Sequence, residues 1–154
     1  MHFVFDWSGQ SAPVGAIAAV NESVWEHLKI AYWPTLFYSI IEYKFLKKIT
    51  NNYYLAKAAC IFITPIVIVT VFYTYTSILG YDILAIDILS FVLGIALGQI
   101  ASYKLLTSQN LPKHIETIGL ILAIVYGICF VVFTYYPPHI SIFRDAETGQ
   151  YGIV

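Results

Sequence analysis

Residues 83–106 read ILAIDILSFVLGIALGQIASYKLL, an apolar run in which only Asp87 and Lys104 carry a charge. A helix needs about 20 mostly apolar residues to cross the hydrocarbon core of a bilayer. The run therefore predicts a membrane-spanning helix, and with it the class of the protein. Asp87 should face the bundle interior, where an acid is a functional candidate. The other interpretation is an interfacial acid that is bonded to a neighbouring hydroxyl group.

The same run contains a stripe of small residues, one at every fourth position: Ser90, Gly94, Gly98 and Ser102. Residues four apart share a face of a helix, and small side chains there let two helix backbones approach closely. The stripe therefore predicts tight helix packing, either within the bundle or in contact with a second copy or a partner helix through the Gly94/Gly98 face.

Residues 30–46, 54–79 and 114–136 are also long and apolar enough to span a bilayer. The chain is 59% apolar and only 11% charged, whereas a typical soluble domain is about 25% charged. We therefore predict an all-α fold: a polytopic membrane helix bundle of four transmembrane helices plus a short outer-face amphipathic helix. It forms one domain, residues 1–154, with an outer tail at residues 137–154. The expected partner is the lipid bilayer, and the near-zero net charge argues against nucleic acid.

Prolines and a tight turn refine this prediction. Pro34 lies near the start of the first predicted span, where a missing amide proton costs least. Pro65 lies near the middle of the second span and should kink it. The turn at Gly80 is so short that residues 54–79 and 83–106 should be antiparallel neighbours.

Asn21-Glu22-Ser23-Val24-Trp25-Glu26-His27-Leu28-Lys29 is the most polar segment near a span. Ser23 and Glu26 have the spacing of a capping box, although a helix could also begin earlier, near Pro13. Glu22 and Glu26 share a helix face and repel each other, so a proton, a metal ion or a basic partner would relieve them. The other interpretation is a capped interfacial helix with Trp25 at headgroup level.

The basic residues predict the orientation in the membrane. Lysines flank two loops, near residues 47–53 and 107–113, and the positive-inside rule places these loops in the cytoplasm. The N-terminus, the Gly80 turn and the tail then face outward, in the cytoplasmic (inner) membrane of a prokaryote. An outward N-terminus without a signal sequence leads us to expect a further hydrophobic helix upstream. Glu42 should pair with one of the lysines that follow it: Lys44, Lys47 and Lys48.

The outer end collects most acids and histidines, which makes it the candidate site. Its possible ligands for a small cation or a proton are Glu22, Glu26, His27, Asp87 and His139. A divalent metal is a possible cofactor, with ligands drawn from His2, Asp6, His27 and His139. Cys60 and Cys129 lie inside apolar runs and are interpreted as small core residues.

The tail should fold back onto the outer end. Two prolines stiffen its start, and Phe143, Tyr151 and Ile153 are too apolar to prefer water. Arg144 is the only basic residue of the tail, so we expect it to pair with a carboxylate of Asp6, Glu22 or Glu26.

Several strings together resemble an uncharacterised family of small multi-pass membrane proteins from bacteria and archaea, a domain-of-unknown-function family. They are Trp7-Ser8-Gly9, the segment from Val20 to Lys29, Pro137-Pro138-His139, and Phe143, Asp145, Thr148-Gly149 and Tyr151-Gly152-Ile153. The resemblance covers nearly the whole chain. The family usually begins with one further hydrophobic helix, and this chain departs from it by starting at Met1. The resemblance implies the membrane class and, because the family has no assigned activity, no catalytic roles.

Three functions are consistent with these patterns. The first is binding or passage of a small cation or proton at the outer pocket. The second is a metal-dependent intramembrane hydrolase acting on a lipid or amide, with Glu22 or Glu26 as general base. The third is a structural helper subunit that docks a partner helix on the small-residue stripe. The sequence favours a non-enzymatic function.

Overall fold

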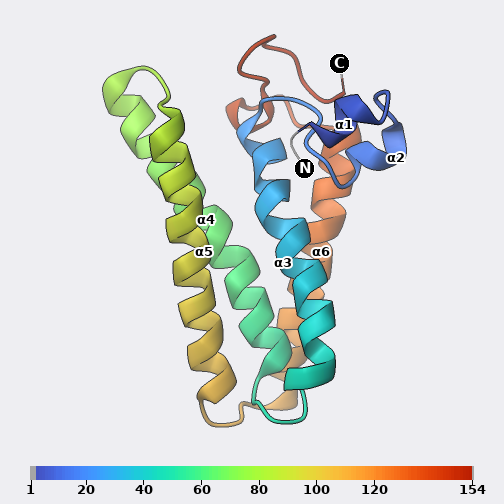
Figure 1. The fold of residues 1–154 in the computed structure, drawn as a ribbon, viewed down its shortest axis with the longest axis vertical. Helices are drawn as coiled ribbons and strands as arrows, with labels where there is room; N and C mark the ends of the chain where they lie inside the picture. The colour runs from blue at the N-terminus through green and yellow to red at the C-terminus, as the bar shows by residue number, and fades with distance from the viewer. Residues whose placement is uncertain (1–2, 154) are drawn as a thin grey trace. The chain divides into compact units, whose positions relative to one another are not determined.

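The computed structural model describes residues 3–153, which are helical and contain no strand. The elements are α1 (Val4–Trp7), α2 (Ala12–Gly15), α3 (Val24–Leu46), α4 (Tyr53–Leu79), α5 (Leu84–Thr107), α6 (Lys113–Tyr135) and the short 3₁₀ helix η1 (Ser141–Phe143) (Figure 1). This confirms the predicted all-α class.

Three of these helices, α4, α5 and α6, are long and apolar enough to cross a membrane. Their bounds differ from the predicted spans by no more than one residue at either end. Helix α3 is not one of them, because Glu26, Lys29, Glu42 and Lys44 interrupt its apolar residues.

Helix α3 differs from the prediction in its continuity. Residues 24–29 form its first turns, so they are not a separate helix ahead of residues 30–46. Residues 24–33 contain neither Gly nor Pro. An uninterrupted helix also satisfies the backbone groups that a break would expose. Pro34 consequently lies inside α3 rather than near its start.

The chain divides into two compact units, and each is described by itself. The first unit contains residues 1–34 and 124–154, and the second contains residues 35–123. The single domain of residues 1–154 stays a prediction.

In the second unit, α4 and α5 form an antiparallel hairpin (Figure 1). All four residues of the small-residue stripe are buried on α5. A Cβ added at Gly94 would lie 2.8 Å from the carbonyl oxygen of Thr64, and one at Gly98 would lie 2.8 Å from its Oγ1. Both glycines thus lie close to α4 within the chain. Contact of this face with a second copy or a partner helix stays a prediction.

The other end of the second unit is held together by two asparagines. The side-chain amide of Asn52 donates to the carbonyls of Leu105 and Gln109, and its Oδ1 accepts from the amide of Leu111. Asn51 donates to the carbonyl of Ser108 over 2.7 Å. These bonds join the loop between α3 and α4 to the loop between α5 and α6.

Ion pairs in the second unit differ from the predicted ones. Glu42 pairs with Lys57 on α4, at 2.6 Å, and not with the lysines that follow it. Lys47 instead pairs with Glu116 at 3.2 Å, and the other oxygen of Glu116 accepts from the backbone amide of Tyr54. Lysines two, five and six residues after Glu42 do not share its helix face, whereas Lys57 reaches it from α4.

Candidate cation site in the first unit

Helix α3 begins with only half of the predicted capping box. The Oγ atom of Ser23 accepts from the backbone amide of Glu26, at 3.3 Å. The Glu26 carboxylate does not return to Ser23, because the Ser23 amide donates to Oδ1 of Asn21 at 3.0 Å. It accepts instead from the backbone amide of Val20, at 3.1 Å. The carboxylate thus fastens the loop that precedes α3.

Glu26 and Lys29 form a buried ion pair, 2.6 Å apart, with 2% and 0% of each residue exposed. The Lys29 ammonium also donates to the carbonyls of Gly15 and Ala18, at 2.8 and 3.3 Å. The second Glu26 oxygen accepts from the Thr134 hydroxyl, at 3.1 Å. Lys29 is thus the basic partner that relieves Glu26, so we leave Glu26 out of the proposed cation site.

The two side chains of this pair together bond to the carbonyls of Gly15 and Ala18, the backbone amide of Val20 and the Thr134 hydroxyl. The pair therefore works as an internal tether between α3 and the segment around α2.

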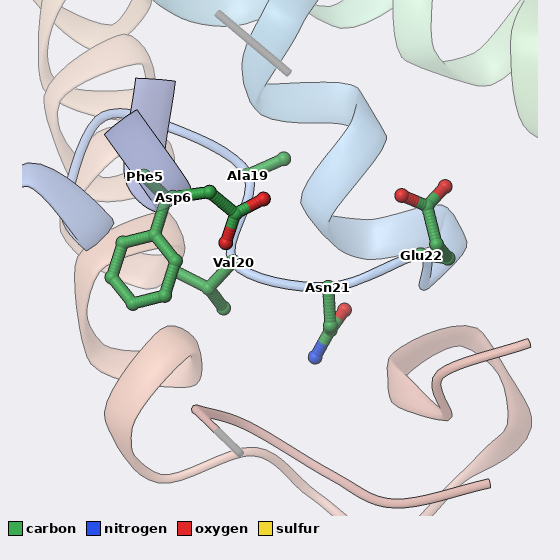
Figure 2. A pocket seen from close by; sticks show the side chains of 6 residues that line it. All are labelled: Phe5, Asp6, Ala19, Val20, Asn21 and Glu22. Carbon is green, nitrogen blue, oxygen red and sulfur yellow. The ribbon is translucent and has the colours of Figure 1, made fainter. Parts of the chain in front are cut away.

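A small pocket lies beside this tether. It is lined by Phe5 and Asp6 from α1 and by Ala19, Val20, Asn21 and Glu22 from the loop before α3 (Figure 2). Its cavity volume is about 40 Å³. One water needs roughly 10–15 Å³ measured in this way, so the pocket can hold a few waters or a small ion, and no organic substrate.

His27 lies next to the Glu22 carboxylate. Its Nε2 is 3.4 Å from Oε2 of Glu22, and the two side chains are 39% and 37% exposed. Its Nδ1 is 2.9 Å from the carbonyl oxygen of Ser23, which accepts when Nδ1 bears the proton. Glu22 thus connects a titratable imidazole with the pocket.

The tail folds onto the same unit, as predicted, but through Asp145 rather than Arg144. The Asp145 carboxylate accepts from the backbone amides of Glu22, at 3.1 Å, and of Glu147, at 3.2 Å. Asn21 donates to the carbonyl of Gly152 over 2.8 Å. The predicted ion pair of Arg144 is wrong: in the described chain its side chain donates to the carbonyl of Gly149 and reaches no carboxylate.

Asp145 is buried, with only 5% of the residue exposed. Burial alone would raise the pKa of its carboxyl group, but hydrogen bonds from Thr148, Glu147 and Glu22 outweigh this and hold the pKa below its usual range. The carboxylate form is thus the one that fastens the tail.

Trp25 packs in an aromatic cluster. Its ring lies 4.7 Å from that of Phe130 on α6 and 4.8 Å from that of Phe143 in η1. Tyr126 and Phe133 on α6 complete its surroundings. The cluster connects the start of α3 with the tail, which explains why both can position the pocket.

The pocket lining does not include His139, although this residue belongs to the same unit. His139 stacks on Tyr151, with ring centroids 4.6 Å apart. Asp87 lies in the second unit, where its carboxylate accepts from the Tyr75 hydroxyl at 2.6 Å. Its role in a shared cation site stays a prediction.

Within residues 3–153, no group of three or more His, Cys, Asp and Glu side chains is placed to hold a metal ion. One of the predicted ligands, His2, lies outside the described residues. The metal set of His2, Asp6, His27 and His139 therefore stays a prediction, as do the hydrolase and the helper subunit.

Sequence reasoning missed three residues of this unit: Lys29 as a buried partner, Thr134 as its neighbour across α6, and Asp145 as the anchor of the tail. The spacing of Glu26 and Lys29, three apart on one helix, was a usable signal. The Asp145–Thr148 pair had the pattern of a turn in which the acid caps the following amides. Nothing in the sequence indicated Thr134.

Comparison with known proteins gives one match. No curated protein and no solved structure matches the chain. A family model described as a family of unknown function matches residues 1–153, nearly the whole length. The resemblance of its sequence to an uncharacterised family is thereby confirmed, and the chain belongs to the family of unknown function DUF6512.

Proposed function

We propose that this protein is an integral membrane protein that binds a small cation or a proton at the pocket between α1 and the loop before α3. In this proposal α3 is a fourth span, with α4, α5 and α6. The loops near residues 47–53 and 107–113 face the cytoplasm of a prokaryote, and the pocket faces outward. Three helices of spanning length support the membrane assignment.

The pocket itself carries the proposal. Two carboxylate residues, Asp6 and Glu22, line a cavity of about 40 Å³. Oxygen-rich sites of this kind suit hard cations such as Ca²⁺ and Na⁺ or a proton. A cavity of this size supports binding of an ion over binding of a lipid or an amide substrate.

His27 supports a link to protons. Histidine is the side chain that ordinarily changes charge between about pH 5 and 8. A proton on His27 would neutralise part of the Glu22 charge across 3.4 Å. We therefore propose that protonation of His27 weakens cation binding at the pocket.

Binding to the purified protein in detergent tests this. Calorimetric titration with Na⁺, Mg²⁺, Ca²⁺ and Zn²⁺, and proton uptake on ion addition, should give one saturable site per chain. Asp6→Asn and Glu22→Gln should each weaken it at least about tenfold, which is the effect of one lost interaction of about 1.4 kcal/mol. Glu147→Gln, at an exposed acid of the tail, is the matched control. Equal binding by all four proteins, or none by the parent, would refute the proposal.

A further inference from the structure

The loop end of the second unit carries an excess of positive charge. We define this end by the loop between α3 and α4, the loop between α5 and α6, and the adjoining helix turns. Its acids are Glu42, which pairs with Lys57, and Glu116, which pairs with Lys47. Four exposed lysines remain there with no carboxylate partner among the described residues: Lys44, Lys48, Lys104 and Lys113.

These lysines lie on or next to two loops that are hydrogen-bonded to each other. Asn52 adopts a left-handed backbone with φ of 49° and joins the two loops through its side-chain bonds. Asn51 adds the bonds to Leu106 and Ser108. These bonds join the loop between α3 and α4 to the end of α5 and to the loop before α6, which lie at the same end of the second unit (Figure 1).

Apolar and aromatic side chains adjoin the lysines. Tyr43 and Phe45 flank Lys44, and they are 41% and 69% exposed. Tyr103, next to Lys104, is 67% exposed. Exposed tyrosines next to lysines at the end of apolar helices are typical of the boundary between hydrocarbon and headgroups. Lysines at such a boundary can reach the phosphates of the lipid headgroups.

We propose that this loop end binds the headgroups of anionic phospholipids in the membrane that α4, α5 and α6 cross. Clusters of four or more basic residues beside a transmembrane helix attract anionic headgroups. Both nearby acids already pair with a lysine, Glu42 with Lys57 and Glu116 with Lys47, so neither competes with the phosphates. The inference rests on the membrane assignment and is independent of the cation pocket.

Electron spin resonance of spin-labelled lipids tests it. The protein is reconstituted in phosphatidylcholine with trace spin-labelled phosphatidylglycerol or phosphatidylcholine, and the lipid held at the protein surface is compared. The parent should prefer phosphatidylglycerol by about twofold to fivefold. The combined variant Lys44→Gln, Lys48→Gln, Lys104→Gln and Lys113→Gln should lose that preference. The same four positions changed to Arg form the matched control, which should keep it.

Salt provides a second measurement that needs no variant. Raising the salt from 0.1 M to 1 M shortens the screening length from about 10 Å to about 3 Å, so the preference of the parent should fall towards one. A preference that survives 1 M salt, persists in the Gln variant, or is absent from the parent would overturn the proposal. Loss in both the Gln and the Arg variants would overturn it too, because positive charge would then not be the cause.

Discussion

The Lys29 ammonium lies 2.6 Å from Oε2 of Glu26, and no part of Lys29 reaches solvent. Two backbone carbonyls, of Gly15 and Ala18, also accept from it. The pair therefore holds the segment around α2 against the first turns of α3. A buried pair is costly to desolvate, but removing one partner leaves an uncompensated charge, which is more costly still.

Lys29→Met and Glu26→Gln should each lower the free energy of unfolding by about 3–5 kcal/mol. The double variant should cost clearly less than the sum, because it leaves no lone charge. Unfolding in detergent, followed by tryptophan fluorescence, measures this. Lys104→Met, at an exposed lysine on α5, is the control and should stay within about 0.5 kcal/mol of the parent. Additive costs in the double variant would show that the two residues act separately.

The hairpin of α4 and α5 should be sensitive to side-chain size at Gly94. Gly94→Leu puts a side chain where even a Cβ would lie 2.8 Å from the backbone oxygen of Thr64, and overpacking of this kind costs about 1–3 kcal/mol. Ala96→Leu adds similar volume on the exposed face of the same helix. It should leave thermal stability in detergent unchanged. Equal melting of the two variants would mean that the α4 contact does not depend on the glycine.

The fold was predictable where the composition of a single segment determines its structure. The spans of α4, α5 and α6 follow from long apolar runs between polar loops, so their bounds came out within one residue. The small-residue stripe likewise identified the face that packs on α4. In each case the side chains themselves determine the outcome, whichever way the rest of the chain folds.

The choice of polar partners was not predictable, because it depends on distances between elements. Arg144 and Asp145 are neighbours, yet only Asp145 is buried and reaches the amide of Glu22. Glu42 has lysines close in sequence but pairs with Lys57 on another helix. The burial of Lys29 contradicts the general tendency of lysine to stay in water, and it requires acceptors from three separate residues.

Whether α3 crosses the membrane decides on which side the N-terminal segment lies. If α3 crosses the membrane, Ala12 and Glu147 lie outside the cell, whereas Thr50 and Gln109 are cytoplasmic. Single cysteines at these positions, with Cys60→Ser and Cys129→Ser, should then react with an impermeant maleimide on intact cells only at positions 12 and 147. Labelling at 50 and 109 should require lysis. If positions 12 and 50 behave alike, α3 does not span the membrane.

The attachment of the tail should depend on acid. The carboxylate of Asp145 accepts from the backbone amides of Glu22, Glu147 and Thr148, and one hydrogen bond to a charged group contributes about 1.5–3 kcal/mol. Asp145→Ala should therefore cost at least that much and expose the tail to protease at neutral pH, whereas Glu147→Ala should not.

The direction of the pH effect follows from the pKa of Asp145, which is lower in the folded protein than the ordinary value of 3.8. As the pH falls, the unfolded chain takes up the proton first. The stabilisation by Asp145 is therefore complete above pH 3.8 and is lost as the pH falls through the lowered folded-state pKa. Digestion with an acid-active protease from about pH 6 to about pH 2 should release the tail only at the acid end of this range. In Asp145→Ala the cleavage should lose this pH dependence. A parent tail that is cut equally at every pH would show that the carboxylate does not hold it.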